Sequence, residues 1–346
     1  MSCVVSSCNF TPMPFPSQNI KEFFAEFEQN KAMALFLGSG TDITTGYPEN
    51  KKYDKIREHK MKWDTLLDEL IKYACVNDKD KEALKMFQAP LKAAILKQKL
   101  GNSYIPIIQQ WLYSHCNRRI LNESYEYYQK YREEPSCENL GKVPFGTLFI
   151  LADLILRQKS IRAVFTQNYN NFLCETIKIL QKKPHAEYDY REIIPIDVYD
   201  GWKEDPFKDN SFLIYHVHGY IPSFSEMMPK PENNHIVLSD DEFHQLSKNV
   251  YSWQNATQLH FFTHYTCILL GLSLDDMTTL RILRHANIEN SGEKVYWLRG
   301  GLIDGSEEEQ RLKAEYFTTQ HLCVVNDANG YNSLYHQLYT QVLCKQ

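Results

Sequence analysis

The stretch that decides the fold is ALFLGSGTDITTGYP, residues 34–48. Residues 32–37 form an apolar run that is too short for a helix and is ended by glycine, so it predicts a buried strand of a parallel sheet. A glycine-rich turn after such a strand brings bare backbone N–H groups to one point, where a pyrophosphate can approach closely. The Gly-Ser-Gly at 38–40 is therefore interpreted as a phosphate-binding loop, while an ordinary tight turn remains the alternative.

Further short apolar runs follow along the chain, separated by segments with helical periodicity. The strand candidates are residues 161–165, 212–217, 266–270, 294–298 and 321–325. Helical spacing predicts helices over 18–31, over 145–159 and from about Phe172. Strands that alternate with helices predict an α/β fold with a doubly wound, Rossmann-like parallel sheet. Residues 184–210 show little periodicity, and we expect a loop there.

Composition divides the chain into three parts. Residues 1–16 carry prolines among small polar residues and are expected to be a flexible N-terminus. Residues 17–49 and 145–346 hold the strand–helix alternation and predict a Rossmann-like domain. Residues 50–144 begin with a highly charged loop and continue with helical spacing, which predicts a mainly helical insertion or subdomain after the first strand.

Bulk properties exclude several classes of protein. The formal charge is -5 and no basic block occurs, so direct binding to nucleic acid is not expected. The nine cysteines are scattered without a CxxC pair, which argues against a disulfide framework and a thiolate zinc site. No signal peptide and no run of ~20 apolar residues occurs, so we expect a cytoplasmic protein without membrane segments.

Polar residues follow the predicted strands directly, at the edge where a doubly wound sheet binds its ligands. Thr166-Gln167-Asn168 comes after the run 161–165. These side chains could hold sugar hydroxyls or orient a water, or they could satisfy the backbone of their own loop.

A second polar patch, HVHG, ends the strand candidate 212–217. Its histidines, His216 and His218, alternate along the strand and could be metal ligands, but no third ligand stands at a recognisable spacing. A single histidine at this position suits a general base, with a core histidine as the alternative.

Two further patches begin helices. Gly271 and Ser273 follow the run 266–270, and Ser273 with Asp276 is interpreted as a capping box. The same pattern of serine followed by an acidic residue occurs at Ser239 with Glu242 and at Ser306 with Glu309. Capping leaves the glycine at the end of 266–270 unexplained.

Together and in this order, these patches resemble the sirtuin superfamily. The similar motifs are GAG…GIP (here Gly38-x-Gly40 and Gly46-Tyr47-Pro48), TQN (Thr166-Gln167-Asn168), HG (His218-Gly219) and GxSL (Gly271-x-Ser273-Leu274).

The chain also departs from sirtuin deacylases. It lacks the two CxxC pairs that hold their structural zinc. Glu49 replaces an aspartate, and Asn170 stands where sirtuins have Asp. The resemblance therefore does not extend to the acyl-lysine groove.

The pattern GYP…Trp63-x-x-Leu66, TQNY, HxHG, LSDDEF and GLSLDD is closer to the sirtuin-like domains of bacterial anti-phage systems. Members of that group hydrolyse NAD and so deplete the infected cell. The resemblance implies an NADase of antiviral defence, with NAD as its substrate, no metal, and Asn168 and His218 as the catalytic pair. The nucleotide-binding residues that it implies are Gly38, Ser39, Gly40, Thr41, Thr166, Gln167, Gly271 and Ser273.

Cleavage of cellular NAD must be restrained until it is needed. Relatives in this group act with a sensor domain, an Argonaute-like protein or a DNA-translocating ATPase. We therefore expect a homo-oligomer or a separate activator protein, with 50–144 and 184–210 as candidate contact segments. A lid or a fold decoration is the alternative for these segments. The alternative functions are an NAD-dependent protein deacylase or ADP-ribosyltransferase, and a non-catalytic NAD or ADP-ribose sensor.

Overall fold

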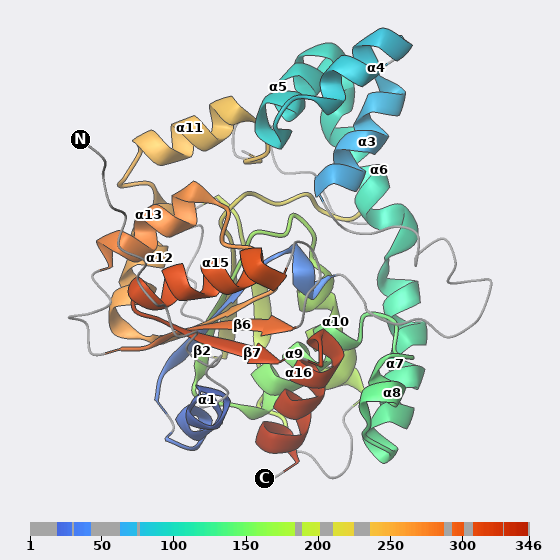
Figure 1. Cartoon of the computed structure of the whole chain (residues 1–346). Coiled ribbons are helices and arrows are strands. Elements are labelled where there is room, and N and C mark those ends of the chain that lie inside the picture. The colour runs from blue at the N-terminus through green and yellow to red at the C-terminus, as the bar shows by residue number, and fades with distance from the viewer. Residues whose placement is uncertain are drawn as a thin grey trace, which may run out of the picture.

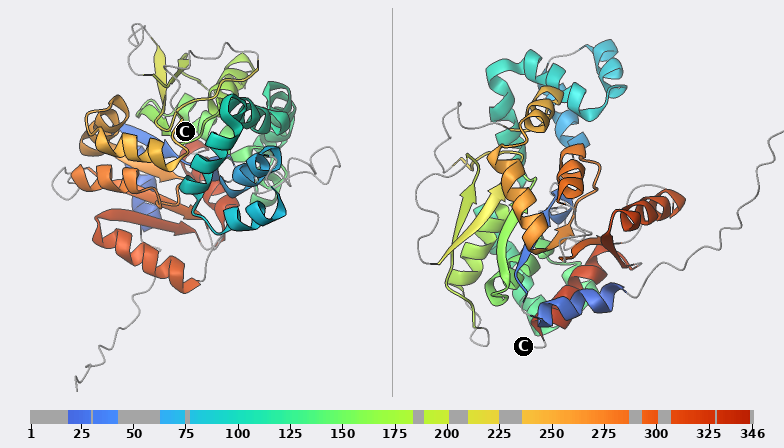
Figure 2. Two further views of the ribbon diagram at one scale, coloured as in Figure 1. Left: turned by 90° about the horizontal axis from the view of Figure 1, so that it is seen from above. Right: turned by 90° about the vertical axis from the view of Figure 1, so that its left-hand side faces the viewer.

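The centre of the molecule is a parallel β-sheet. The computed structural model describes residues 19–29, 31–42, 63–74, 77–183, 189–200, 210–224, 236–286, 293–300, 307–327 and 329–344. In these residues seven strands lie in the order β3-β4-β2-β1-β5-β6-β7, and every neighbouring pair is parallel. Helices cover both faces of the sheet (Figures 1 and 2). The predicted α/β, Rossmann-like fold class is confirmed.

The strands fall close to the predicted apolar runs. They are β1 (Met33–Leu37), β2 (Ile161–Thr166), β3 (Ile194–Val198), β4 (Ser211–His216), β5 (Thr266–Leu270), β6 (Val295–Gly300) and β7 (Leu322–Asp327). All five residues of the central strand β1 are buried, which explains its continuous apolar run. Because β1 pairs with both β2 and β5, the loops that follow these three strands emerge side by side.

Strand β3 corrects the expectation of a loop over 184–210. It lies at the edge of the sheet and pairs with β4. Ile194 is 55% exposed, and Pro195 is the one residue of the strand that is buried. An edge strand tolerates proline and needs no apolar run, so hydrophobic periodicity gave no signal for it.

The helices fill the intervals between the strands. Those described are α1 (Asn19–Glu28), α3 (Trp63–Tyr73), α4 (Asp78–Lys85), α5 (Ala89–Leu100), α6 (Tyr104–His115), α7 (Arg118–Glu133), α8 (Cys137–Leu140), α9 (Gly146–Arg157), α10 (Phe172–Lys182), α11 (Asp240–Lys248), α12 (Trp253–His264), α13 (Met277–His285), α15 (Glu307–Thr319) and α16 (Tyr331–Leu338), with the short turns η1 (Ser39–Thr41) and η2 (Gly101–Ser103) and the π-helical turn η4 (Tyr339–Leu343). None of them is long and apolar enough to cross a membrane.

Alternate residues of β1 build the two hydrophobic layers. Leu35 and Leu37 face the layer that contains α9, α10 and α16. Phe36 faces the other layer, where its ring stacks on Phe262 of α12 with the centroids 4.1 Å apart. The period of two along a strand thus places alternate side chains of β1 in the hydrophobic layers on opposite faces of the sheet.

The described residues between η1 and α9 form helices α3 to α8 and η2. Helix α7 packs against helices that cover the sheet. There the Tyr128 hydroxyl donates to Asp153 of α9 at 2.7 Å. Helix α5 lies beside α11, to which it is joined by the ion pair of Lys97 and Glu242 (Figure 1). The division into a sheet domain and an insertion stays a prediction.

Candidate functional site

The loops after β1 and β5 are in direct backbone contact. The N–H of Gly38 donates to the Leu270 carbonyl, and the N–H of Gly40 donates to the Gly271 carbonyl, both at 3.0 Å. A Cβ atom on Gly38 would lie 2.4 Å from the Gly271 oxygen, and one on Gly271 would lie 2.5 Å from the Thr41 nitrogen. Gly271 also has a φ of +63°, which favours glycine. The glycines are therefore required for the packing of two loops, independently of any ligand.

This contact occupies part of the predicted phosphate-binding backbone. Besides the Gly40 N–H, that of Thr41 donates to the Gly38 carbonyl at 3.0 Å. Ser39 is exposed, and its N–H makes none of these contacts. Among the N–H groups of Ser39, Gly40 and Thr41, that of Ser39 is thus the one best placed to receive a pyrophosphate. Gly46 and the segment after it lie outside the described residues.

The carboxamide of Asn168 is oriented by the β1 loop. Its Nδ2 donates to the Gly38 carbonyl at 3.2 Å and to the Thr41 hydroxyl at 3.3 Å, while its backbone N–H donates to the Thr166 hydroxyl at 3.0 Å. The Gly38 carbonyl can only accept, so the nitrogen end of the amide must face this loop. Within the described part of the chain, Asn168 Oδ1 has no hydrogen-bonding partner, and it is available to a ligand.

The imidazole of His218 is held from the β5 side. Its Nε2 lies 3.5 Å from Oδ2 of Asp276, and its ring packs edge-on against Phe243 with centroids 5.5 Å apart. Phe243 packs in turn on Trp63 of α3 at 5.7 Å. The side chain of His218 is 8% exposed, and its Nδ1 has no partner among the described residues. That nitrogen can therefore accept a proton.

Asp276 connects the two catalytic candidates. Its Oδ2 accepts from Nε2 of Gln167 at 3.2 Å as well as facing His218, and Gln167 is the chain neighbour of Asn168. Although burial alone would raise the pKa of Asp276, the hydrogen bond and the positive charge of His218 lower it below its ordinary value. The carboxylate is therefore ionised at neutral pH and can stabilise a positive charge on His218.

Asp276 also corrects the predicted capping box. It is the N-cap of α13, where its carboxylate accepts from the N–H groups of Thr278 at 2.9 Å and Thr279 at 3.2 Å. Ser273 is exposed and its hydroxyl accepts from the Asp275 N–H at 3.4 Å, so it does not cap the helix.

The other two predicted capping boxes differ in their outcome. The one formed by Ser239 and Glu242 is confirmed at the start of α11. Ser306 lies outside the described residues, so its capping box stays a prediction.

His216 has a different environment from His218. Its Nδ1 lies 3.0 Å from the Asn168 carbonyl, and its Nε2 lies 2.8 Å from Oδ1 of Asp197 on β3. The two histidines therefore do not converge on one point. In the described ranges no group of three His, Cys, Asp or Glu side chains could hold a metal ion.

A buried carboxyl group, Asp42, lies directly behind Asn168 and was not singled out in the sequence. Its Oδ2 accepts from Nδ2 of Asn170 at 2.6 Å, and both side chains are buried. Burial raises the pKa of Asp42 to about 7, although hydrogen bonds from Asn170 and Asn168 oppose the increase. Its place two residues after Gly40 was the available signal, but only the fold shows which loop it faces.

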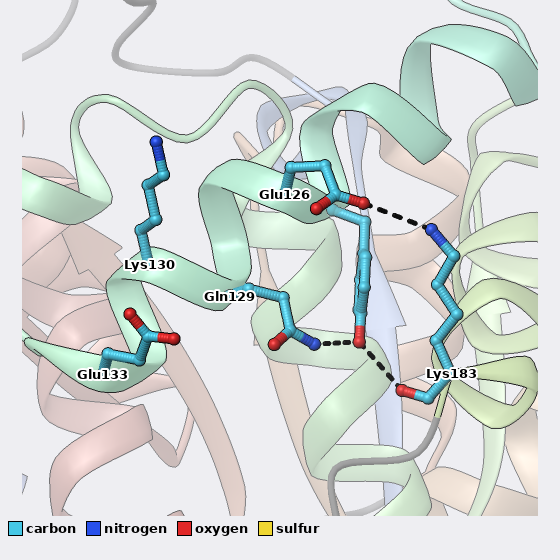
Figure 3. Close-up of a pocket in the computed structure, with 6 residues that line it drawn as sticks. Glu126, Gln129, Lys130, Glu133 and Lys183 are labelled. Carbon is cyan, nitrogen blue, oxygen red and sulfur yellow. Dashed lines mark hydrogen bonds and ion pairs between the residues drawn. The ribbon is translucent and has the colours of Figure 1, made fainter.

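A surface depression lies elsewhere, along α7. Its lining residues are Tyr125, Glu126, Gln129, Lys130, Glu133 and Lys183 (Figure 3). Glu126 and Lys183 pair across it at 3.3 Å. Charges of both signs neutralise one another here, and none of these side chains belongs to the edge of the sheet.

One known family matches part of the chain. Residues 162–321 match the family model of the SIR2-like domain. The matched segment begins in β2 and contains Asn168, His218 and Asp276, whereas Asp42 precedes it. The match supports the sirtuin-like family, which is a family of NAD-related enzymes. No curated protein is detectably similar to the chain.

Proposed function

We propose that this chain hydrolyses NAD at the nicotinamide ribose to give nicotinamide and ADP-ribose. The observation that carries the proposal is the network at the carboxyl edge of the sheet, in which Asn168 offers an amide oxygen and His218 offers a ring nitrogen. Gln167 and Asp276 link the two within the SIR2-like segment. Ligands of doubly wound sheets bind at this edge.

The chemistry requires a positioned sugar rather than a strong nucleophile. The nicotinamide ring of NAD is a pyridinium cation that leaves as neutral nicotinamide, so the positive charge passes to an oxocarbenium-like ribose that water attacks. Asn168 Oδ1 accepts a hydrogen bond from a ribose hydroxyl or from the attacking water. His218 accepts the proton that this hydroxyl or water gives up.

Asp276 selects the nitrogen of His218 that does this work. A carboxylate beside Nε2 favours the tautomer that carries hydrogen on Nε2 and leaves the lone pair on Nδ1. When Nδ1 takes up a proton, the same carboxylate stabilises the imidazolium. Asp276 is thus a positioning residue, and Nδ1 is the reactive atom.

The proposal is tested by incubating the purified chain with NAD, with and without candidate activators, and identifying the products. We expect nicotinamide and linear ADP-ribose in equal amounts. Cyclic ADP-ribose would instead identify a cyclase, and nicotinamide release that requires an acylated peptide would identify a deacylase. The proposal would be contradicted if the purified chain bound NAD tightly and released no nicotinamide, either in purified form or in phage-infected cells. That result would identify a sensor.

We further propose that NAD cleavage serves anti-phage defence and is held back until an activator binds or the chain self-assembles. Support comes from the closer likeness of its motifs to sirtuin-like anti-phage domains than to deacylases. The experiment compares cellular NAD after phage infection in bacteria that express the chain or its His218→Ala variant. A fall in NAD that needs both infection and His218 is expected. Full NAD cleavage by a monomer in uninfected cells would contradict the restraint.

A further inference from the structure

Two loops contribute one acidic and one amide side chain to a single buried contact behind Asn168. Asp42 comes from the loop after β1 and is 4% exposed, and Asn170 comes from the loop after β2 and is 7% exposed. Asp42 Oδ2 accepts from Asn170 Nδ2 at 2.6 Å. Asn170 stands where sirtuins have an aspartate, so this chain has an amide at that position and a carboxyl group at position 42.

A buried carboxylate is unfavourable unless its oxygens are hydrogen-bonded. Asp42 meets this need with donors from Asn170, Asn168 and Thr41, and the charge of His216 also acts on it. Burial raises the pKa of the Cys116 thiol and of the Tyr335 hydroxyl, and the negative charge of Asp42 raises both further. A second carboxylate at Asn170 would repel the first, so the contact accommodates one carboxylate and one amide.

We infer that Asp42 supplies the single carboxylate of this site from the β1 loop and is a positioning residue that fixes the carboxamide of Asn168. The inference deepens the proposed NAD hydrolysis and rests on it for its activity readout. Asp42 holds the loop of Asn168 through Asn170, two positions further along the chain, and the nitrogen end of the Asn168 amide faces Gly38 and Thr41. Oδ1 of Asn168 is thereby kept toward the ligand, because a flipped amide would place its oxygen against these acceptors.

The test is a swap of the two side chains. Asp42→Asn removes the carboxylate, and Asn170→Asp adds a second one beside the first. Each single variant is expected to lower kcat for nicotinamide release by about tenfold with little change in KM, a loss typical of coupled polar pairs. The double variant Asp42→Asn/Asn170→Asp restores one carboxylate and one amide. We expect its kcat to return to within about threefold of the wild-type value.

A neighbouring asparagine provides the matched control. Asn171 is also buried, but its Oδ1 lies 3.4 Å from the Tyr113 hydroxyl, and it belongs to a different contact. Asn171→Asp combined with Asp42→Asn is therefore expected to show no rescue. Equal rescue by the two aspartates would show that any nearby negative charge suffices, which would overturn the pairing.

Thermal unfolding separates failure of this inference from failure of the proposed function. If the wild-type chain cleaves no NAD, either purified or in phage-infected cells, the proposed function fails, yet coupling between positions 42 and 170 is still measurable as non-additive melting temperatures. If the double variant is folded but its kcat is as low as that of the less active single variant, the positioning role is wrong. Additive melting temperatures would contradict the contact itself.

Discussion

The two histidines of the HVHG segment lie two positions apart but belong to different regions of the sheet edge. His216 is enclosed on the β3 side, where one ring nitrogen faces Asp197 and the other faces the Asn168 carbonyl. His218 is held on the β5 side through Nε2 alone, next to Asp276. Each histidine thus has its own acidic partner, and only the second keeps a ring nitrogen available.

This difference distinguishes a structural histidine from a reactive one. Both ring nitrogens of His216 lie within hydrogen-bonding distance of a partner, and together they tie strand β3 to the backbone of the Asn168 loop. His218 has one nitrogen held and one free, which is the arrangement that a general base requires. Alternating histidines on a strand therefore need not indicate a metal site.

The largest effect is expected from removing the two imidazoles in turn. His218→Ala should lower kcat for nicotinamide release by about 10²- to 10⁴-fold, the usual contribution of a general base, with an almost unchanged melting temperature. His216→Ala leaves two acceptors unpaired and should lower the free energy of unfolding by about 1–3 kcal/mol for each of them. Urea unfolding and steady-state kinetics measure both effects. A stable but inactive His216→Ala variant would break the comparison.

Exchanging the acidic partners sharpens the same distinction. Asp276→Asn preserves the cap of α13, because asparagine and aspartate are equally good N-caps, but it removes the charge that supports His218. A loss of about 10- to 100-fold in kcat with little change in KM is expected. Asp197→Asn should instead mainly lower the melting temperature. Equal losses of kcat in the two variants would show that His216 and His218 do not differ in role.

The β5 loop that carries Asp276 depends on Gly271. Gly271→Ala introduces a methyl group where no space exists and should lower the free energy of unfolding by about 1–3 kcal/mol, and kcat with it. Gly101→Ala is the control, because Gly101 also has a positive φ, of +52°, but has open space around it. The two variants therefore share the backbone strain and differ in the clash. Similar unfolding free energies would show that the close contact of the two loops is unimportant.

The smallest effect is expected from Asp42, as a dependence of the unfolding free energy on pH. Asp42 interacts electrostatically with His216. Its folded-state pKa of about 7 exceeds the ordinary value of 3.8, so the folded chain binds this proton more tightly than the unfolded chain does. Its contribution to stability is complete below the ordinary value and is lost as the pH rises toward about 7. Asp42→Asn should therefore gain stability relative to wild type as the pH rises from about 4 to about 7.

Urea unfolding of both proteins across this range measures the difference. A constant gap between the two would contradict the raised pKa. The same variant is expected to be less active, so a gain in stability and a loss of kcat would separate positioning from folding.

The sequence was sufficient for most of the sheet because buried parallel strands are short apolar runs. It missed β3, since Pro195 and the exposed Ile194 belong to an edge strand that needs no such run. It misplaced the start of α13 because Leu274 has a φ of +56°, which separates Ser273 from the helix that Asp276 caps.

The site was only partly predictable from the sequence. Motif order singled out Asn168 and His218, and the structure gives each of them partners on a neighbouring loop. The carboxyl group of Asp42 was missed, since it meets Asn170 across 128 positions of the chain. Such pairings are set by which strands become neighbours in the sheet, and periodicity contains no information about them.

The most direct test of the central claim is nicotinamide release by the purified Asn168→Ala and His218→Ala variants under conditions in which the wild-type chain cleaves NAD. The account predicts that both variants are folded, with melting temperatures close to that of the wild-type chain, and that neither releases nicotinamide above background. Undiminished turnover in either variant would contradict it.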